Sequence, residues 1–306
     1  MNKEQYIKNL CVPDGKIDVI LDTDAYNEID DQFAISYMLK CPDKFNVIGI
    51  TAAPFYLPNK ADNVADGMEK SYKEILKLLA LADMQELNEK VLRGSTDYLK
   101  NETTPQSSEA ADFIIESAKH YSPEKPLYVI AIGAITNVAS AIIKAPEIAE
   151  NIVIVWLGGH AHHMPDTYEF NMYQDIAAAR VVFSCSSPFV QLSCRGVVDK
   201  FATSKYELEH WLLGKNKLCD YLVKNAIEEA ESYAKGKPWT RVIWDVTAVA
   251  WTQNHDERYM NETIITAPIP TYDNKYEPNP QGKPMKYIYR VDRDALFEEL
   301  FSKLGE

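Results

Sequence analysis

Short apolar runs alternate with longer amphipathic segments along most of this sequence, and this alternation restricts the fold more than any other feature. Strands that are buried on both faces of a parallel sheet read as nearly continuous Val, Ile and Leu. Five runs have this character: 17–22, 45–52, 126–133, 151–159 and 188–193. Helical patterns fill the intervals, at 30–40, 62–82, 107–120, 135–145 and 175–184. The alternation predicts βαβ units and therefore an α/β fold with a mostly parallel central sheet flanked by helices.

The last third of the chain is mainly helical in pattern. Helices are predicted at 204–236, 245–253 and 292–304. The first of these segments reads as two helices that meet near Gly214. The stretch 267–290 is rich in Pro and Asn, which predicts an exposed loop or hairpin. Because no repeat or linker interrupts the chain, we expect one domain over 1–306, in which 204–240 could form a helical cap.

Composition and charge exclude several classes of protein. A net charge of -13 without a basic stripe argues against a nucleic-acid partner, because phosphate binding needs clustered Lys and Arg. No apolar run has the length of a membrane span, and the N-terminal segment lacks the apolar core of a signal peptide, so we expect a cytoplasmic location. The cysteines are odd in number and form no C-x-x-C pair, which favours reduced thiols over disulfides or a zinc site.

An acidic segment follows the first predicted strand directly. It reads DTDAYNEIDD (22–31) and holds four aspartates and one glutamate in ten positions. Carboxylates this close repel one another, and a hard cation such as calcium or magnesium would relieve the repulsion. Such an ion would also activate a water molecule whose proton one aspartate could take. The alternative is that Asp30 or Asp31 only favours the start of a helix, which leaves the other acids unexplained.

Polar clusters occupy the ends of other predicted strands as well. In open α/β sheets, ligands bind beyond the carboxyl ends of the strands. Clusters at 22–31, 132–133 and 158–171 stand at such ends, and Asp245 starts a late helix. Because parallel strands point the same way, we expect these clusters to converge on one face of the molecule.

Several motifs, in chain order, resemble those of the nucleoside hydrolase family, the calcium-dependent enzymes that cleave the N-glycosidic bond of nucleosides. The acidic segment 22–31 resembles the family's D-x-D-x-G-x-D-D, with two additional residues and no glycine. Residues 132–137 read IGAITN and are similar to T-G-P-L-T-N, and 244–248 read WDVTA and are similar to H-D-P-x-A. The most specific match is at 158–183, where EFN is followed by DIAAA. The resemblance runs from residue 17 to 253 and implies the Rossmann-like fold of that family.

The resemblance also implies roles for the matching residues. Asp24 would be the catalytic general base. The metal ligands would be Asp24, Asp31, the Ile132 carbonyl and Asp245, and the metal would be Ca²⁺. The residues expected to bind substrate are Asp30, Asn27, His163, Glu169, Phe170, Asn171 and Trp244. Acceptors and amides suit a ribose, whose hydroxyls need paired hydrogen bonds once they are buried.

The chain also departs from the family pattern. Trp244 stands where many members have a histidine associated with protonation of the leaving base. The indole could instead stack on the base, or it could be a packed core residue. The additional Asn27 and Glu28 lengthen the acidic loop, and this variant is similar to a divergent branch of the superfamily whose substrates need not be nucleosides.

Three histidines lie in the segment GGHAHH: His160, His162 and His163. They have no Cys or His partner at a recognised spacing, which argues against a transition-metal site. His163 lies near the position of a family asparagine, so we expect it to line the sugar pocket. His162 or His163 could replace the missing acid, or the segment could be a solvated surface loop.

These observations predict calcium-dependent hydrolysis of a ribonucleoside, which releases ribose and a base. One alternative is a hydrolase of the same fold that acts on a different glycoside or ribosylated metabolite. The other is a catalytically impaired sugar-binding protein. We expect a small-molecule substrate, no nucleic-acid or membrane partner, and a homo-oligomer, a dimer or tetramer, in which the loop 267–285 could take part.

Overall fold

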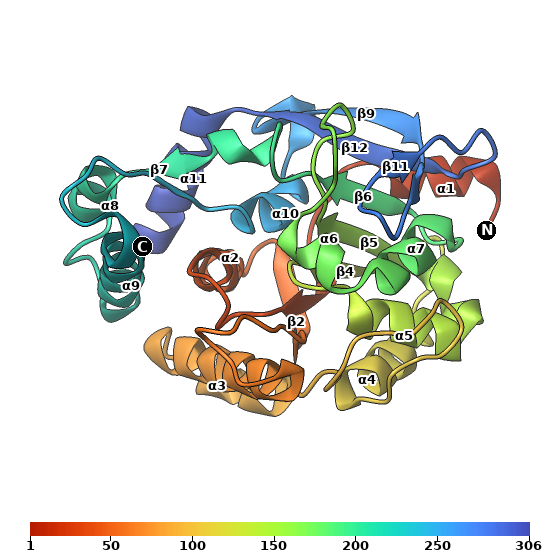
Figure 1. The fold of residues 1–306 in the computed structure, drawn as a ribbon, viewed down its shortest axis with the longest axis horizontal. Coiled ribbons are helices and arrows are strands. Elements are labelled where there is room, and N and C mark those ends of the chain that lie inside the picture. The colour runs from red at the N-terminus through yellow and green to blue at the C-terminus, as the bar shows by residue number, and fades with distance from the viewer.

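Eight strands form one central sheet in the computed structural model, which describes all of residues 1–306 (Figure 1). In spatial order the strands are β3 (Val91–Leu92), β2 (Phe45–Ala52), β1 (Ile17–Thr23), β4 (Leu127–Ala131), β5 (Ile152–Leu157), β6 (Phe189–Leu192), β12 (Pro284–Val291) and β9 (Met260–Thr266). All neighbouring strands are parallel except β12 and β9, which are antiparallel. The predicted α/β fold with a mostly parallel sheet is confirmed.

Two small antiparallel pairs lie outside this sheet. The first joins β7 (Ala202–Thr203) to β8 (Arg241–Val242), and the second joins β10 (Ile269–Pro270) to β11 (Tyr276–Glu277). The first pair matters for the site, because it places Arg241 beside the acidic loop.

Helices flank the sheet on both faces (Figure 1). They are α1 (Lys3–Asn9), α2 (Asp30–Leu39), α3 (Val64–Leu81), α4 (Glu109–Ala118), α5 (Thr136–Lys144), α6 (Phe170–Gln174), α7 (Ile176–Ser184), α8 (Lys205–Trp211), α9 (Lys217–Ala234), α10 (Val246–Trp251) and α11 (Arg293–Gly305). Short 3₁₀ helices are η1 (Gln85–Lys90), η2 (Pro146–Asn151), η3 (Val198–Lys200) and η4 (His255–Glu257). None of the helices combines the length and the apolar character that a membrane span requires.

The sheet separates two hydrophobic cores. Successive side chains of a strand point to opposite faces. Val153 and Val155 of β5 therefore lie in the larger core, with side chains from α2, α3, α9, α10 and α11. Ile154 and Trp156 lie in the smaller core, with side chains from α4, α5 and α7. Because helices cover both faces, the inner strands read as continuous apolar runs in the sequence.

Side-chain caps start several of these helices where the sequence predicts them. Asn63, Ser108 and Asn216 each accept a hydrogen bond from a backbone N–H in the first turn of α3, α4 and α9. Ser204 forms a capping box at the start of α8. Between α8 and α9, Gly214 has φ +79, a conformation that a side chain disfavours. The backbone conformation of Gly214 therefore explains why the two predicted helices meet near this residue.

The expected loop or hairpin at 267–290 is confirmed only in its first part, where β10 and β11 form an antiparallel pair. Its last part, β12, is an inner strand of the central sheet, between β6 and β9. Lys286 of β12 is buried, and its ammonium pairs with Glu262 on β9. The charged Lys286 interrupts the buried apolar positions of this strand, which weakens its hydropathy pattern. The N-terminal helix α1 was likewise not predicted; it begins where the Asn2 side chain caps the first turn.

Candidate active site

A pocket lies at the carboxyl ends of β1, β4, β5 and β6, where the polar clusters from distant parts of the sequence meet. Its volume is about 210 Å³, which suits a compact ligand. The residues that line it are Asp24, Asn27, Glu28, Asp30, Asp31, Ile132, Leu157, His160, Tyr168, Glu169, Phe170, Asn171, Cys194, Arg195, Trp244 and Asp245. Of the residues predicted from the sequence to form the site, all but His163 line this pocket.

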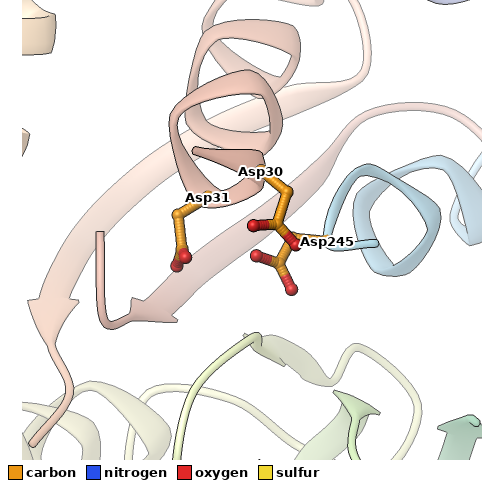
Figure 2. Close-up of side chains that lie close together, drawn as sticks. All are labelled: Asp30, Asp31 and Asp245. Atoms are coloured by element: carbon orange, nitrogen blue, oxygen red, sulfur yellow. The ribbon is translucent and has the colours of Figure 1, made fainter. Parts of the chain in front are cut away.

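Three aspartates form the densest acidic group of the pocket (Figure 2). Asp30 and Asp31 begin α2, and Asp245 is the N-cap residue of α10, which packs against α2. One carboxylate oxygen from each lies within 4.8 Å of the others. This grouping differs from the predicted ligand set, because it contains Asp30 in addition to two of the predicted ligands. Helix–helix packing thus brings together acids that are more than two hundred residues apart.

Asp24 lies beside this group, in the loop between β1 and α2. Its carboxylate packs against Gly133, at the end of β4, where a Cβ atom would lie 2.8 Å from Asp24 Oδ1. The side chain is buried, and its Oδ2 atom has no hydrogen-bond partner. Steric contact with Gly133 therefore restricts the position of Oδ1, whereas Oδ2 is left without a hydrogen-bond partner.

Burial and crowding raise the pKa values of these acids. Burial is the main cause of the raised pKa of Asp24, Asp30 and Asp245, and neighbouring carboxylates raise the pKa of each further. Burial also raises the pKa of Asp31, to about 7, although the Thr23 hydroxyl donates a hydrogen bond that lowers it. Four buried carboxylates cannot all be ionised unless a positive charge lies among them.

The donor set fits a hard divalent cation. Besides Asp24 Oδ2, the buried atoms Asp30 Oδ1 and Asn27 Oδ1 have no hydrogen-bond partner. Buried polar atoms are normally paired, so three unpaired oxygens in one pocket indicate a ligand. All of these donors are oxygens, which calcium and magnesium prefer, and no histidine or thiolate joins them as a zinc site would require.

Ile132 lines the pocket at the end of β4, and its side chain belongs to the larger hydrophobic core. Its N–H donates to the Asp22 carbonyl at 2.8 Å, which fixes the peptide at the end of β4. The Asn171 side chain donates to the carbonyl oxygens of Ile132 (3.2 Å) and Leu157 (3.1 Å). A carbonyl oxygen has two lone pairs, so the Ile132 carbonyl can accept this bond and still face a cation.

Glu169 is held more firmly than the sequence suggests. It is the N-cap residue of α6, and its carboxylate accepts hydrogen bonds from the backbone N–H groups of Gly159, Asn171 and Met172 at 2.8 to 3.0 Å. Gly159 has φ +76, and a Cβ there would lie 2.1 Å from the hydroxyl of Tyr276. A glycine is therefore required for the turn that presents its N–H to Glu169.

Aromatic side chains form another wall of the pocket. Phe170 and Trp244 are half-buried, and Tyr168 is largely exposed and stacks on Tyr173 at 4.4 Å between ring centroids. Phe170 meets Tyr173 edge to face. Such a wall can bind the flat face of a heterocyclic ring.

The histidines separate into different environments. His160 lines the pocket and is buried, whereas His163 is not among the lining residues. His163 instead lies near Gly196, where a Cβ would be 3.1 Å from its ring. His162 lies between the rings of Tyr276 and Tyr287, and it contacts Gln191 at 2.8 Å. Sequence spacing alone does not distinguish these three positions.

The lengthened acidic loop is clamped by cations from outside the pocket. Arg241 of β8 pairs with Glu28 in the loop and lies 3.5 Å from Glu229 of α9. Lys60 donates to the Asn27 carbonyl and pairs with Glu229 at 3.3 Å. These contacts neutralise Glu28 and hold the two additional residues at the rim of the pocket.

Arg195, Cys194 and Tyr168 also line the pocket but were not predicted from the sequence. Cys194 and Arg195 follow β6, so the rule that ligands bind at strand ends is the signal that points to them. The predicted strand at 188–193 ends just before these residues.

Comparisons with known proteins agree with this architecture. The sequence model of the family described as inosine-uridine preferring nucleoside hydrolase matches residues 19–298. An Arabidopsis thaliana relative, named probable uridine nucleosidase 2, is 28% identical over 226 residues, which cover 67% of each chain.

Solved structures show the same fold. A purine-preferring ribonucleoside hydrolase from Gardnerella vaginalis has a TM-score of 0.73 and 23% identity, over 94% of this chain and 98% of that one. A plant nucleoside hydrolase has a TM-score of 0.74 and 20% identity, over 94% and 99% of the two chains. The family match extends from β1 into α11 and therefore includes every strand end that lines the pocket.

Proposed function

This chain belongs to the inosine-uridine preferring nucleoside hydrolase family, whose chemistry is hydrolysis of N-glycosidic bonds, and we propose that it cleaves a ribonucleoside with the help of calcium. The observation that carries this proposal is the buried group of carboxylates with unpaired oxygens at the ends of the parallel strands. An acidic group of this kind, next to amide and aromatic side chains, suits a cation, a ribose and a base together.

Calcium would be held by Asp24, Asp31, the Ile132 carbonyl and Asp245. Asp30 lies within the same group and is a further candidate ligand, besides the predicted contact with a ribose hydroxyl. A bound divalent cation supplies a fixed position and a lowered pKa for a water ligand. The unpaired oxygens of Asp24 and Asp30 support this assignment.

The carboxylates of the chain would act directly on the reaction. Asp24 takes the proton of the attacking water. Water adds to the anomeric carbon as the bond to the base breaks, through an oxocarbenium-like state. The negative charge of the neighbouring aspartates stabilises the positive charge that develops on the sugar.

Asn171 and Glu169 would orient the sugar. Their side chains are fixed by hydrogen bonds to backbone groups, so little freedom is lost when a ligand binds. The aromatic wall, with Trp244 and Phe170, would stack against the departing base. A stacked ring lowers the need for a proton on the base, which would compensate for the absence of a histidine at position 244.

The test is release of reducing sugar from purine and pyrimidine ribonucleosides, with calcium and with a chelator. We expect release that the chelator abolishes and added calcium restores. Absence of release from every ribonucleoside, with calcium bound stoichiometrically, would contradict the proposal and favour a different ribosylated substrate. Binding of ribose without any turnover would favour a sugar-binding protein.

A further inference from the structure

Two neighbouring loops, one after β5 and one after β6, form one side of the pocket. The loop after β5 carries His160, and the loop after β6 carries Arg195. The Cys194 N–H donates to the Gly159 carbonyl at 2.8 Å, and the Ala161 N–H donates to the Arg195 carbonyl at 2.9 Å. These two backbone hydrogen bonds flank His160 on both sides, so His160 and Arg195 are held side by side.

Gly196 allows the two loops to approach this closely. It has φ +89, and a Cβ there would lie 2.8 Å from the Cβ atom of Ala161. The backbone conformation is one that glycine adopts without strain. Gly196 therefore makes the close contact between these two loops possible.

Arg195 is the only cation among the residues that line the pocket. Its side chain is exposed, forms no ion pair and makes no hydrogen bond within the chain. By contrast, Arg93, Arg180, Arg241 and Arg293 all pair with acids. In a chain of net charge -13, a guanidinium that remains unpaired at a pocket is available to an anionic ligand.

His160 presents a second unpaired group at the same place. Its side chain is 5% exposed, yet its Nδ1 atom has no hydrogen-bond partner. Burial is the main cause of its lowered pKa, and the positive charge of Arg195 lowers this pKa further. The acids Asp166 and Asp199 act in the opposite sense, but the Asp199 carboxylate already accepts a hydrogen bond from the Gly196 N–H.

The position of the pair relative to the acids suggests which part of a substrate it would contact. The strand order is β1, β4, β5, β6, so β4 and β5 lie between the acids after β1 and the pair after β6, and the two groups stand on opposite sides of one pocket. The acids at β1 would take the ribose 2′- and 3′-hydroxyls, and the aromatic wall would take the base. The remaining substituent of a ribonucleoside is the one at the 5′-carbon.

We propose that Arg195 and His160 form an anion subsite, and that the substrate is a ribonucleoside carrying a phosphate on its 5′-oxygen. This inference rests on the proposed function. Arginine donates two parallel hydrogen bonds to phosphate oxygens, and an exposed position at the pocket suits a group that keeps part of its hydration. Hydrolysis would then release ribose 5-phosphate and the free base, with one water consumed.

The first experiment compares inosine with inosine 5′-monophosphate, and uridine with uridine 5′-monophosphate, in the calcium-loaded protein. We expect kcat/KM to be at least ten-fold higher for the monophosphates, and this preference to decrease as ionic strength rises. Arg195→Gln should lower the ratio of monophosphate to nucleoside by at least ten-fold. The matched control is Lys200→Gln, an exposed cation nearby that does not line the pocket, which should leave the ratio unchanged.

A nucleoside preference in the wild-type protein, or equal losses for both substrates in Arg195→Gln, would overturn the subsite. The second outcome is the one expected if Arg195 contacts the base instead. Binding of ribose 5-phosphate and ribose, measured by calorimetry, separates this inference from the proposed function. If no substrate is hydrolysed but ribose 5-phosphate binds at least ten-fold more tightly than ribose, and Arg195→Gln removes the difference, the subsite stands and the proposed hydrolysis fails.

His160→Asn tests the second member of the pair. It keeps a polar side chain of smaller size in the buried position. We expect it to reduce the preference for the monophosphate in the same direction as Arg195→Gln. An unchanged preference in a variant whose thermal unfolding matches the wild type would remove His160 from the subsite.

Discussion

Asp24 depends for its position on Gly133, which follows the neighbouring strand β4. A Cβ at residue 133 would lie 2.8 Å from Asp24 Oδ1 and 3.0 Å from the Cβ atom of Ala53. Only a residue without a side chain leaves room for the carboxylate there. The other carboxylate oxygen is unpaired, so the same residue combines a fixed orientation with a free acceptor. At the scale of single residues, this combination is what a general base requires.

The variant Asp24→Asn tests that role. The amide has nearly the size of the carboxylate but cannot take a proton from water. We expect kcat to fall by about 10²- to 10⁴-fold, the usual contribution of a general base. The measurement is kcat for the substrate that is cleaved fastest, with calcium at saturation.

The matched control for this variant is Asp43→Asn, at an exposed acid in the turn between α2 and β2. It should keep kcat within two-fold of the wild type. Activity of Asp24→Asn within a few fold of the wild type would exclude Asp24 as the base.

At the scale of elements, Asp175 joins three segments of the chain. It is the N-cap residue of α7, and its Oδ1 atom accepts the Ala178 N–H at 2.9 Å. Its Oδ2 atom accepts the Leu99 N–H at 2.9 Å and the Thr136 hydroxyl at 2.7 Å. One buried carboxylate thereby attaches α5, α7 and the loop after β3 to one another, on the side of the sheet away from α2.

This arrangement predicts a specific pH dependence of stability. Burial raises the pKa of Asp175 from 3.8 to about 6, so the folded state binds more protons than the unfolded state between these values. The contribution of Asp175 to the free energy of unfolding therefore decreases as pH rises from about 4 to 6. Relative to Asp175→Asn, we expect the wild type to lose about 2 kcal/mol between pH 4.5 and pH 7.5.

Urea unfolding of both proteins at the two pH values measures this difference. The other buried acids are the same in both proteins, so their pH-dependent contributions cancel when the two free energies of unfolding are subtracted. Glu86→Gln changes an exposed acid without an ion pair, so it should show no pH-dependent difference from the wild type. A wild-type advantage that grows with pH would contradict the direction of the pKa shift.

At the scale of the whole molecule, the acidic pocket opposes folding unless a cation is present. Elements from both ends of the chain, α2 and α10, meet there and bring their aspartates together. Both helices also belong to the larger hydrophobic core, so the acids cannot separate without loss of packing. The stability of the fold should therefore depend on occupation of the pocket.

We expect calcium to stabilise the folded state. At a concentration 100 times its Kd, a ligand that binds only the folded state raises the free energy of unfolding by about 2.7 kcal/mol. Urea unfolding in calcium and in chelator, at equal ionic strength, measures the difference. Asp31→Asn should reduce it, and identical curves for the wild type would count against a calcium site.

Much of the architecture follows from local patterns in the sequence. Continuous apolar runs predicted the inner strands such as β4 and β5, because burial on both faces removes any polar alternation. The family match has confirmed the resemblance that the motifs EFN and WDVTA suggested. Residues at strand ends pointed to the pocket, since parallel strands place their carboxyl ends on one side.

Tertiary contacts decided the rest, because they join residues whose separation in sequence carries no periodic signal. The strand β12 is fixed by its pairing with β6 and β9, and one of its buried positions is Lys286, whose charge is balanced by Glu262 on β9. Packing of two loops brought His160, and not His163, into the pocket beside Arg195. Local periodicity therefore determined which segments are strands and helices, whereas the charges and polar atoms that face the ligand were set by long-range packing.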